Sequence, residues 1–244
     1  MNDDDDETDA LAGRYARRAG PDRYSAIHPD AWAAMQERQR AMLRLFARLG
    51  WADLGALRLL EVGFGGGANL LELLRLGFAP EHLSGAELLP VRTAHARRVL
   101  PAGIALFEGD ALRMNVAPGS QDVVFASTVF SSLLDDAFQQ RLADAMWSWV
   151  KPGGGVLWYD FTVNNPHNAD VRGVPLRRVQ ALFPQGRVRA QRITLAPPIA
   201  RAVTRVHLAL YTVFNALPPL RTHVLAWIGK SPQVGDAAAP SASR

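Results

Sequence analysis

The sequence predicts a single α/β domain built on a doubly wound, mostly parallel sheet. Its length of 244 residues suits one such domain, and 48% of its residues are hydrophobic, which is enough for a sizeable core. Short apolar runs alternate with segments of helical periodicity, which indicates a sheet covered by helices on both faces. Glycines directly follow the first apolar run, a pattern typical of folds that bind a ligand where a strand ends.

The first half of the chain alternates helices with strands. Apolar residues at helical spacing predict a helix up to Leu49, and Gly50 is expected to end it. Pro90 suits the first turn of a later helix, which ends before Pro101. In order, we predict a helix over 29–49, a strand over 58–62, a helix over 68–76, a strand over 82–86 and a helix over 90–99.

The second half continues this alternation and closes with a strand. Asp135 or Asp136 is expected to cap a long helix, which ends before Pro152 and Gly153. Predicted strands cover 104–107, 122–126, 155–161, 186–195 and 221–228, and predicted helices cover 136–150, 172–182 and 199–217.

The two ends of the chain differ in composition from the body. Residues 1–12 form an acidic leader that we expect to be disordered, and residues 231–244 form an expected disordered tail. The acidic start is unlike a secretory or mitochondrial targeting segment, so we expect a cytoplasmic protein. Residues 13–230 are expected to form the single domain.

Composition excludes several classes of protein and site. No run of about 18 apolar residues is present, so we expect no membrane span. The chain has no cysteine, which excludes disulfides, thiolate metal sites and a cysteine nucleophile. Its six histidines lack the spacing of metal ligands, and we expect no catalytic metal.

The positive charge of the chain is carried almost entirely by arginine. The formal net charge is +4, and Lys151 and Lys230 are the only lysines. A nucleic-acid surface usually mixes and clusters both residue types, whereas these arginines are spread along the chain. We therefore expect a solvated surface and no DNA binding. An acidic substrate, an anionic membrane surface and RNA remain alternatives.

The glycine cluster carries the strongest functional signal. Gly63, Gly65 and Gly67 allow a tight turn with positive φ, and a helix begins directly after them. Dinucleotide-binding turns space their glycines as G-x-G-x-x-G, whereas this turn reads G-x-G-x-G. Glu61 stands two residues before Gly63 and would repel an anion. A cationic or zwitterionic ligand therefore fits this turn better than a pyrophosphate, which disfavours a nicotinamide dehydrogenase.

The segment Glu61-Val62-Gly63-Phe64-Gly65-Gly66-Gly67 resembles the first motif of class I S-adenosylmethionine (SAM) dependent methyltransferases. The resemblance implies that the backbone of this turn, with Gly63, Phe64, Gly65 and Gly67, contacts the methionine part of SAM. It implies that Glu61 orients the amino group of SAM.

Later segments resemble the same family in the same order. Ser84-Gly85-Ala86-Glu87 resembles the end of its second strand, and Glu108-Gly109-Asp110-Ala111 resembles the loop after its third. Residues 122–127 resemble its fourth motif, and 149–155 resemble the connection to its fifth strand. The resemblance implies ribose contacts from Glu87, next to Leu88, and an adenine contact from Asp110. It also implies backbone contacts from Ala111 and Leu112, and a position for Ser127 near the reactive end of SAM.

The resemblance also implies an architecture. It predicts a Rossmann-like, seven-stranded sheet with an antiparallel last strand, with Tyr15 or Tyr24 closing over SAM from an N-terminal helical cap. The helix over 199–217 is an addition between the last two strands; it could pack on the core, wall a substrate pocket, bind a partner chain or touch a membrane. The implied parts are the cap over 13–50, a SAM-binding core over 55–165 and a substrate-side part over 166–230.

The acceptor of the methyl group is less well specified. A base within hydrogen-bond reach of the acceptor assists O- or N-methylation. Asp160 and His167 are our candidates because they belong to the polar segment 159–168, which begins at the end of the fifth strand. The C-terminal half resembles small bacterial methyltransferases of polysaccharide or natural-product biosynthesis. This implies a small-molecule acceptor with a sugar, glycolipid or natural-product hydroxyl, and S-adenosylhomocysteine (SAH) as the second product.

Two alternatives to this function stay open. An RNA methyltransferase is one, although Ser127-Thr128-Val129-Phe130 lacks the Asp/Asn-Pro-Pro-aromatic motif of the adenine-targeting types. A non-catalytic SAM-binding module is the other. The sequence leaves the oligomeric state open.

Overall fold

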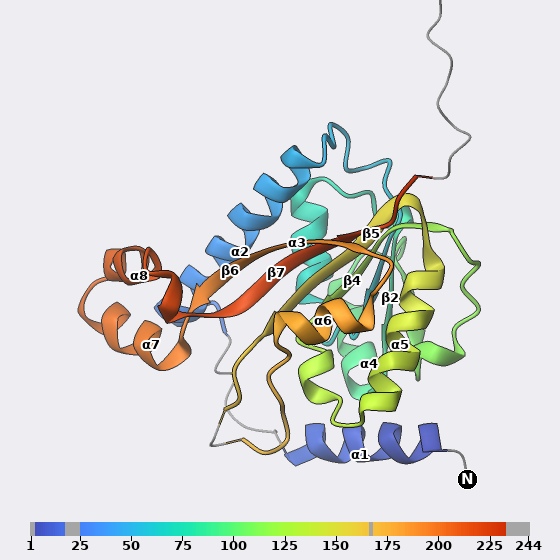
Figure 1. Cartoon of the computed structure of the whole chain (residues 1–244), viewed down its shortest axis with the longest axis horizontal. Coiled ribbons are helices and arrows are strands. Elements are labelled where there is room, and N and C mark those ends of the chain that lie inside the picture. The colour runs from blue at the N-terminus through green and yellow to red at the C-terminus, as the bar shows by residue number, and fades with distance from the viewer. Residues whose placement is uncertain (1–2, 18–24, 166–167, 233–244) are drawn as a thin grey trace, which may run out of the picture.

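The computed structural model describes residues 3–17, 25–165 and 168–232, and it shows a seven-stranded sheet between two layers of helices (Figure 1). The helices are α1 (Asp3–Arg17), α2 (Pro29–Arg48), α3 (Ala68–Leu76), α4 (Pro90–Val99), α5 (Asp136–Trp149), α6 (Leu176–Leu182), α7 (Pro197–Val206) and α8 (Ala209–Asn215). The strands are β1 (Leu59–Val62), β2 (Leu83–Glu87), β3 (Ala105–Glu108), β4 (Gln121–Ser127), β5 (Val150–Phe161), β6 (Arg187–Leu195) and β7 (Arg221–Gly229). No described helix is both long enough and apolar enough to cross a bilayer.

The strand order is β3-β2-β1-β4-β5-β7-β6, and β7 runs antiparallel to both of its neighbours. This confirms the predicted Rossmann-like sheet with an antiparallel last strand. β1 lies between β2 and β4, and Val62 is in register with Ala86 and Ala126. The order of strands reverses between β1 and β4. Ligands of such sheets bind beyond the carboxyl ends of the strands at this switch point.

Each face of the sheet buries its own hydrophobic core. On one face, α2, α3 and α4 contribute side chains such as Phe46, Leu70 and Ala96. On the other face, α5 and α6 pack side chains such as Met146 and Leu182 against the sheet. Asp135 begins α5 as predicted, because its carboxylate accepts a hydrogen bond from the N–H of Phe138.

The N-terminal segment differs from the prediction of a disordered leader over 1–12. Residues 3–17 form α1, at the bottom of Figure 1 below α4 and α5. Leu11 is buried, and Glu7 accepts hydrogen bonds from Arg14 and from the N–H of Leu134. These tertiary contacts stabilise a helix that acidic composition alone does not favour.

The inserted helix of the substrate-side part is also corrected. Instead of one helix over 199–217, the chain forms α7 and α8, separated at His207 and Leu208. His207 is extended, and its Nδ1 accepts a hydrogen bond from the N–H of Ala209, which starts the second helix. Most of the tail predicted over 231–244 lies outside the described residues.

Candidate active site

The glycine turn after β1 leaves an open surface at the switch point. Gly63, Gly65 and Gly67 all have positive φ, with values of 70°, 58° and 90°. A Cβ on Gly63 would lie 2.7 Å from a methyl group of Val129, whereas a Cβ on Gly65 would meet no atom within 4 Å. The turn is therefore packed against Val129 at Gly63 and open at Gly65, where a ligand can approach the backbone.

Phe64 anchors the turn in the core. Its side chain is 3% exposed and packs beneath the turn, where a Cβ on Gly85 of β2 would approach its ring to 2.7 Å. The N–H groups of Gly63 and Phe64 both donate to the carbonyl of Ala86. Phe64 is thus oriented inward, and only its backbone is available to a cofactor.

Glu61 is a fully buried carboxylate beside this open turn. One oxygen, Oε1, accepts a hydrogen bond of 2.6 Å from the side chain of Asn69, and Oε2 has no hydrogen-bond partner among the described residues. Burial raises the pKa of Glu61 to about 8, although Asn69 and Arg38 act in the opposite direction. An unpartnered buried carboxylate oxygen fits a positively charged donor, such as the amino group of SAM.

Glu87 at the end of β2 shapes the turn. It is 3% exposed, and its two oxygens accept hydrogen bonds from the N–H groups of Gly65 (2.8 Å) and Leu89 (2.9 Å). The carboxylate therefore connects the glycine turn to the start of α4. The neighbouring Leu88 is half-buried against the core on the α5 side.

The loop after β3 lies at the same edge of the sheet. Asp110 caps a short 3-10 turn over Ala111–Arg113, and its Oδ1 accepts from the N–H of Leu112 at 2.9 Å. Gly109 is fixed to the end of β2, because its N–H donates to the carbonyl of Glu87. The candidate ribose and adenine residues are thus neighbours along the edge.

A buried polar network that the sequence did not reveal connects this turn to α2. Arg38 donates to Glu72 at 2.6 Å and to Asn69 at 2.7 Å, and its guanidinium lies 3.4 Å from the hydroxyl of Ser127. It also lies over the ring of Tyr159, 5.2 Å from the centroid. The network joins the ends of β1, β4 and β5. Arg38 lies in an ordinary amphipathic helix, so no local pattern marks it.

The backbone is strained directly after β4. Thr128 has a φ of 56°, which residues other than glycine rarely adopt, and its N–H donates to the carbonyl of Tyr159 at 2.7 Å. Such strain is frequent at functional sites, where surrounding structure holds it in place. Ser127 and Thr128 form the part of the site beside the turn of β1.

Helix α1 covers the same end of the molecule. Arg14 donates to the carbonyl of Ser132 after β4, and the guanidinium of Arg92 at the start of α4 lies 4.2 Å from the centroid of the Tyr15 ring. α1 therefore reaches elements that follow β2 and β4, on both sides of the glycine turn. Tyr24, the other residue expected to close the site, lies outside the described residues.

Of the two candidate bases, Asp160 and His167, the structure describes only Asp160. Asp160 is 2% exposed, and its oxygens accept from the N–H groups of Ser131 (3.0 Å) and Phe161 (2.9 Å). Burial raises its pKa to about 7. Its contacts hold the segment after β4 against β5. His167 lies outside the described residues.

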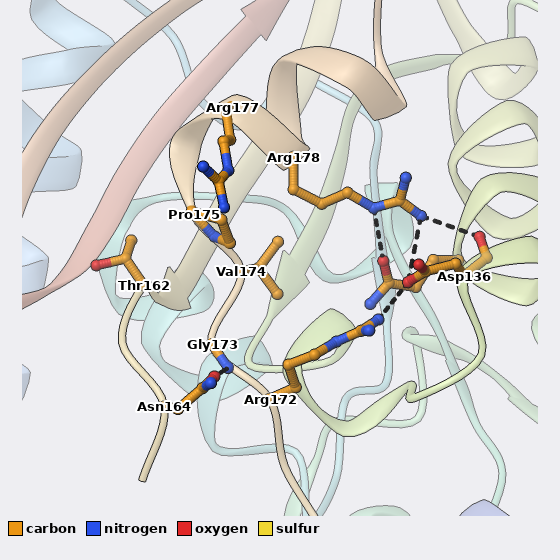
Figure 2. A pocket seen from close by; sticks show the side chains of 10 residues that line it. Asp136, Thr162, Asn164, Arg172, Gly173, Val174, Pro175, Arg177 and Arg178 are labelled. Atoms are coloured by element: carbon orange, nitrogen blue, oxygen red, sulfur yellow. Dashed lines mark hydrogen bonds and ion pairs between the residues drawn. The ribbon is translucent and has the colours of Figure 1, made fainter.

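A cavity of about 440 Å³ opens after β5, between the start of α5 and the start of α6 (Figure 2). Arg172 and Arg178 point toward Asp136 and form ion pairs with its carboxylate, whereas Arg177 makes no ion pair with a described residue. Asn164 accepts from the N–H of Gly173 on the opposite wall. Three guanidinium groups and one carboxylate make the cavity net positive.

Comparisons with known proteins agree with this fold. A family model described as a methyltransferase domain matches residues 59–154, and no curated protein sequence matches the chain. The structure is similar to a SAM-dependent methyltransferase from Mesorhizobium loti, with 16% identity and a TM-score of 0.54 over 79% of this chain and 96% of that one. It is also similar to one from Archaeoglobus fulgidus, with 13% identity and a TM-score of 0.56 over 80% and 96%.

A third similar structure holds the cofactor itself. Phosphoethanolamine N-methyltransferase 2 from Haemonchus contortus, in complex with SAM, has 17% identity and a TM-score of 0.55 over 80% of this chain and 52% of that one. The sheet order is that of the Rossmann-like methyltransferase fold, and the matched methyltransferase domain includes the turn after β1.

The raised pKa of Glu61 yields a test of whether this residue binds the amino group of SAM, as the sequence predicts. Below pH 8 the carboxyl group is largely protonated in the free protein, and a cationic amino group would favour its ionised form. Cofactor binding would then release a proton, so SAH affinity is expected to rise as the pH increases from 6 to 8 and to level off above 8. Calorimetry in buffers of different ionisation enthalpy measures both effects. Glu61→Gln is expected to bind SAH more weakly and without this pH dependence; an unchanged pH dependence would remove Glu61 from the amino-group site.

Proposed function

We propose that this protein transfers the methyl group of SAM to a hydroxyl of a small acceptor, such as a sugar, a glycolipid or a natural product, that carries an anionic group. The net positive cavity after β5 carries this proposal. Thr162, the first residue beyond β5, lines this cavity. The cavity therefore lies at the edge of the sheet where ligands of this fold bind. Guanidinium groups bind carboxylate and phosphate groups through paired hydrogen bonds.

The same proposal assigns the cofactor contacts. Oε2 of Glu61 accepts from the amino group of SAM, and the backbone at Gly65 lies against the methionine part. Glu87 shapes the turn and offers its remaining lone pairs to the ribose hydroxyls. Asp110 and the adjoining backbone contact the adenine. The unpartnered oxygen of Glu61 and the open space above Gly65 support these assignments.

The residues of this chain would act mainly by positioning. Bound SAM supplies a methyl group on a positively charged sulfur, and transfer requires the acceptor oxygen to be held in line with it. The strained backbone at Thr128 and the Arg38 network fix the end of β4, where the two ligands would meet. The arginines after β5 would hold the acceptor through its anionic group, away from the reacting hydroxyl.

Asp160 provides a test of how the acceptor is activated. Asp160→Asn is expected to leave SAH affinity within about twofold, because Asp160 lies on the α5 side of the sheet and does not contact the turn. It is expected to lower kcat at least tenfold, since an amide has one oxygen and can accept only one of the two backbone hydrogen bonds that Asp160 accepts. If Asp160 is the base, kcat of the wild type rises through about pH 7 and this rise is absent in the variant. An unchanged kcat would show that Asp160 is not the base and that its backbone hydrogen bonds do not affect turnover.

Arg177 provides the test of the acceptor class. Release of SAH is measured with hydroxylated acceptors in matched pairs, with and without a phosphate or carboxylate. We expect turnover of the anionic members only, and Arg177→Ala is expected to raise their KM about tenfold, the loss of one charge-assisted hydrogen bond. Arg98→Ala, an exposed arginine on α4, is the matched control. Turnover of the neutral members with equal kcat/KM would contradict an anionic acceptor, and turnover of RNA alone would replace it with the RNA alternative.

A further inference from the structure

The charges of this chain are divided unevenly along its length. Residues 171–235 contain ten arginine or lysine residues and no aspartate or glutamate, and apart from Asp236 every acidic residue precedes them. This basic segment includes β6, α7, α8 and β7. A formal net charge of +4 for the whole chain therefore conceals a strongly positive C-terminal part.

Helices α7 and α8 within this segment are firmly attached on their inner side. Tyr211 is buried and donates to Glu37 of α2 at 2.8 Å, and Asn215 donates to the other oxygen of Glu37 at 2.6 Å. Ala200 of α7 packs into the same small core as Tyr211. The pair is thus a fixed part of the fold, at the left extremity of the molecule in Figure 1.

The pair and the residues that flank α8 also expose apolar side chains to solvent. Leu210, Val213 and Phe214 lie at i, i+3, i+4 spacing in α8, and Leu217 follows the helix, whereas Tyr211 is the residue of α8 that packs into the core. Val213 is 60% exposed and Leu217 is 55% exposed. We define the outer face by five exposed apolar residues: Val206, Leu208, Val213, Phe214 and Leu217.

Exposed cations accompany this outer face. Arg201 and Arg205 lie one turn apart on α7 and are exposed, and neither forms an ion pair with a described residue. No carboxylate exists in α7, α8 or the adjoining strands to neutralise them. A pair of helices that carries exposed aliphatic side chains together with arginines without acidic partners is typical of a surface that lies in the interface of an anionic membrane. RNA would favour polar and stacking groups over branched aliphatic ones.

We propose that the outer face of the α7–α8 pair binds the surface of bilayers that contain anionic lipid. The apolar side chains would enter the headgroup boundary, while Arg201 and Arg205 would contact lipid phosphates. The proposal does not depend on the identity of the acceptor. If it holds, the enzyme works beside a membrane, where an amphiphilic anionic acceptor would be concentrated.

Sedimentation with vesicles tests this proposal on the full chain. We expect binding to vesicles of phosphatidylcholine with phosphatidylglycerol, little binding to phosphatidylcholine alone, and loss of binding at high salt. The double variant Val213→Ser/Leu217→Ser removes two exposed side chains and is expected to weaken vesicle binding about tenfold. Its SAH affinity, which reports on folding, is expected to stay unchanged. Val91→Ser, which alters a 75% exposed valine on α4, is the matched control and should bind vesicles like the wild type.

Three results would overturn the proposal. The first is equal vesicle binding by the wild type and the double variant, and the second is no binding to anionic vesicles. The third is self-association of the wild type, seen by sedimentation velocity and lost in the double variant, because it would identify a second copy of the chain as the occupant. Replacing Arg201 and Arg205 with glutamine provides an independent arm, in which the dependence on anionic lipid should fall while the apolar residues remain.

Discussion

The Gly65→Val protein is expected to lose SAM and SAH binding while keeping its fold. The space above Gly65 is open, and a branched side chain there would occupy the position proposed for the methionine part of the cofactor. We expect affinity to fall more than about 100-fold, which corresponds to roughly 3 kcal/mol. Titration calorimetry with SAH measures the affinity, and circular dichroism with urea unfolding measures the fold.

Backbone strain is the other consequence of this substitution and needs a matched control. Gly65 has a φ of 58°, and a residue with a Cβ in this region costs roughly 1–2 kcal/mol. Gly50 has a φ of 75° and likewise no atom within 4 Å of a Cβ, but it lies after α2 and before β1, whereas the turn follows β1. Gly50→Val is therefore expected to lose similar stability and to bind SAH normally. Equal SAH affinity in Gly65→Val and wild type would place the cofactor elsewhere.

Arg38→Met is expected to be the most destabilising single substitution in the site. The side chain of Glu72 is 5% exposed, and without Arg38 its carboxylate would be buried with no opposite charge. Breaking a buried ion pair in this way costs about 3–5 kcal/mol, a large part of the usual stability of a domain. Urea unfolding measures the loss, and SAH affinity is expected to fall as well because Arg38 holds Asn69 beside Glu61.

A control substitution on the same helix distinguishes the cost of leaving a buried charge unpaired from the cost of replacing an arginine of the helix. Arg40 is exposed two residues away, and Arg40→Met is expected to change the free energy of unfolding by no more than about 0.5 kcal/mol. Adding Glu72→Gln to Arg38→Met should restore part of the lost stability, since the unpaired charge is then absent. A cost for Arg38→Met no greater than that for Arg40→Met would show that the network contributes nothing.

Local sequence patterns predicted the sheet and the turn because both are encoded locally. The glycines of the turn, Pro90 at the start of α4 and Asp135 at the start of α5 act on their immediate neighbours. The methyltransferase resemblance rests on the same short segments, so candidate residues for the donor side could be named one by one from the sequence. The strand order then follows from the α/β alternation and the resemblance together.

Features that depend on distant contacts could not be predicted in this way. Arg38 reaches Glu72 and Ser127 from another helix, and α1 is stabilised by Glu7 binding the N–H of Leu134. The inserted helix breaks because the side chain of His207 bonds to the backbone of the next turn. The sequence made Asp160 a candidate base, and its burial with two backbone hydrogen bonds also depends on distant contacts. The residues proposed to bind the acceptor depend on such distant contacts, so the sequence specified them least.

Titration calorimetry of the wild-type protein with SAH and, separately, with NAD tests the central claim most directly. Oε2 of Glu61, which lies beside the glycine turn and has no hydrogen-bond partner among the described residues, favours a ligand with a positively charged amino group over one with a pyrophosphate. We predict saturable binding of SAH at one site per chain and no binding of NAD at the same concentrations. Binding of NAD without binding of SAH would contradict the assignment of the turn to SAM.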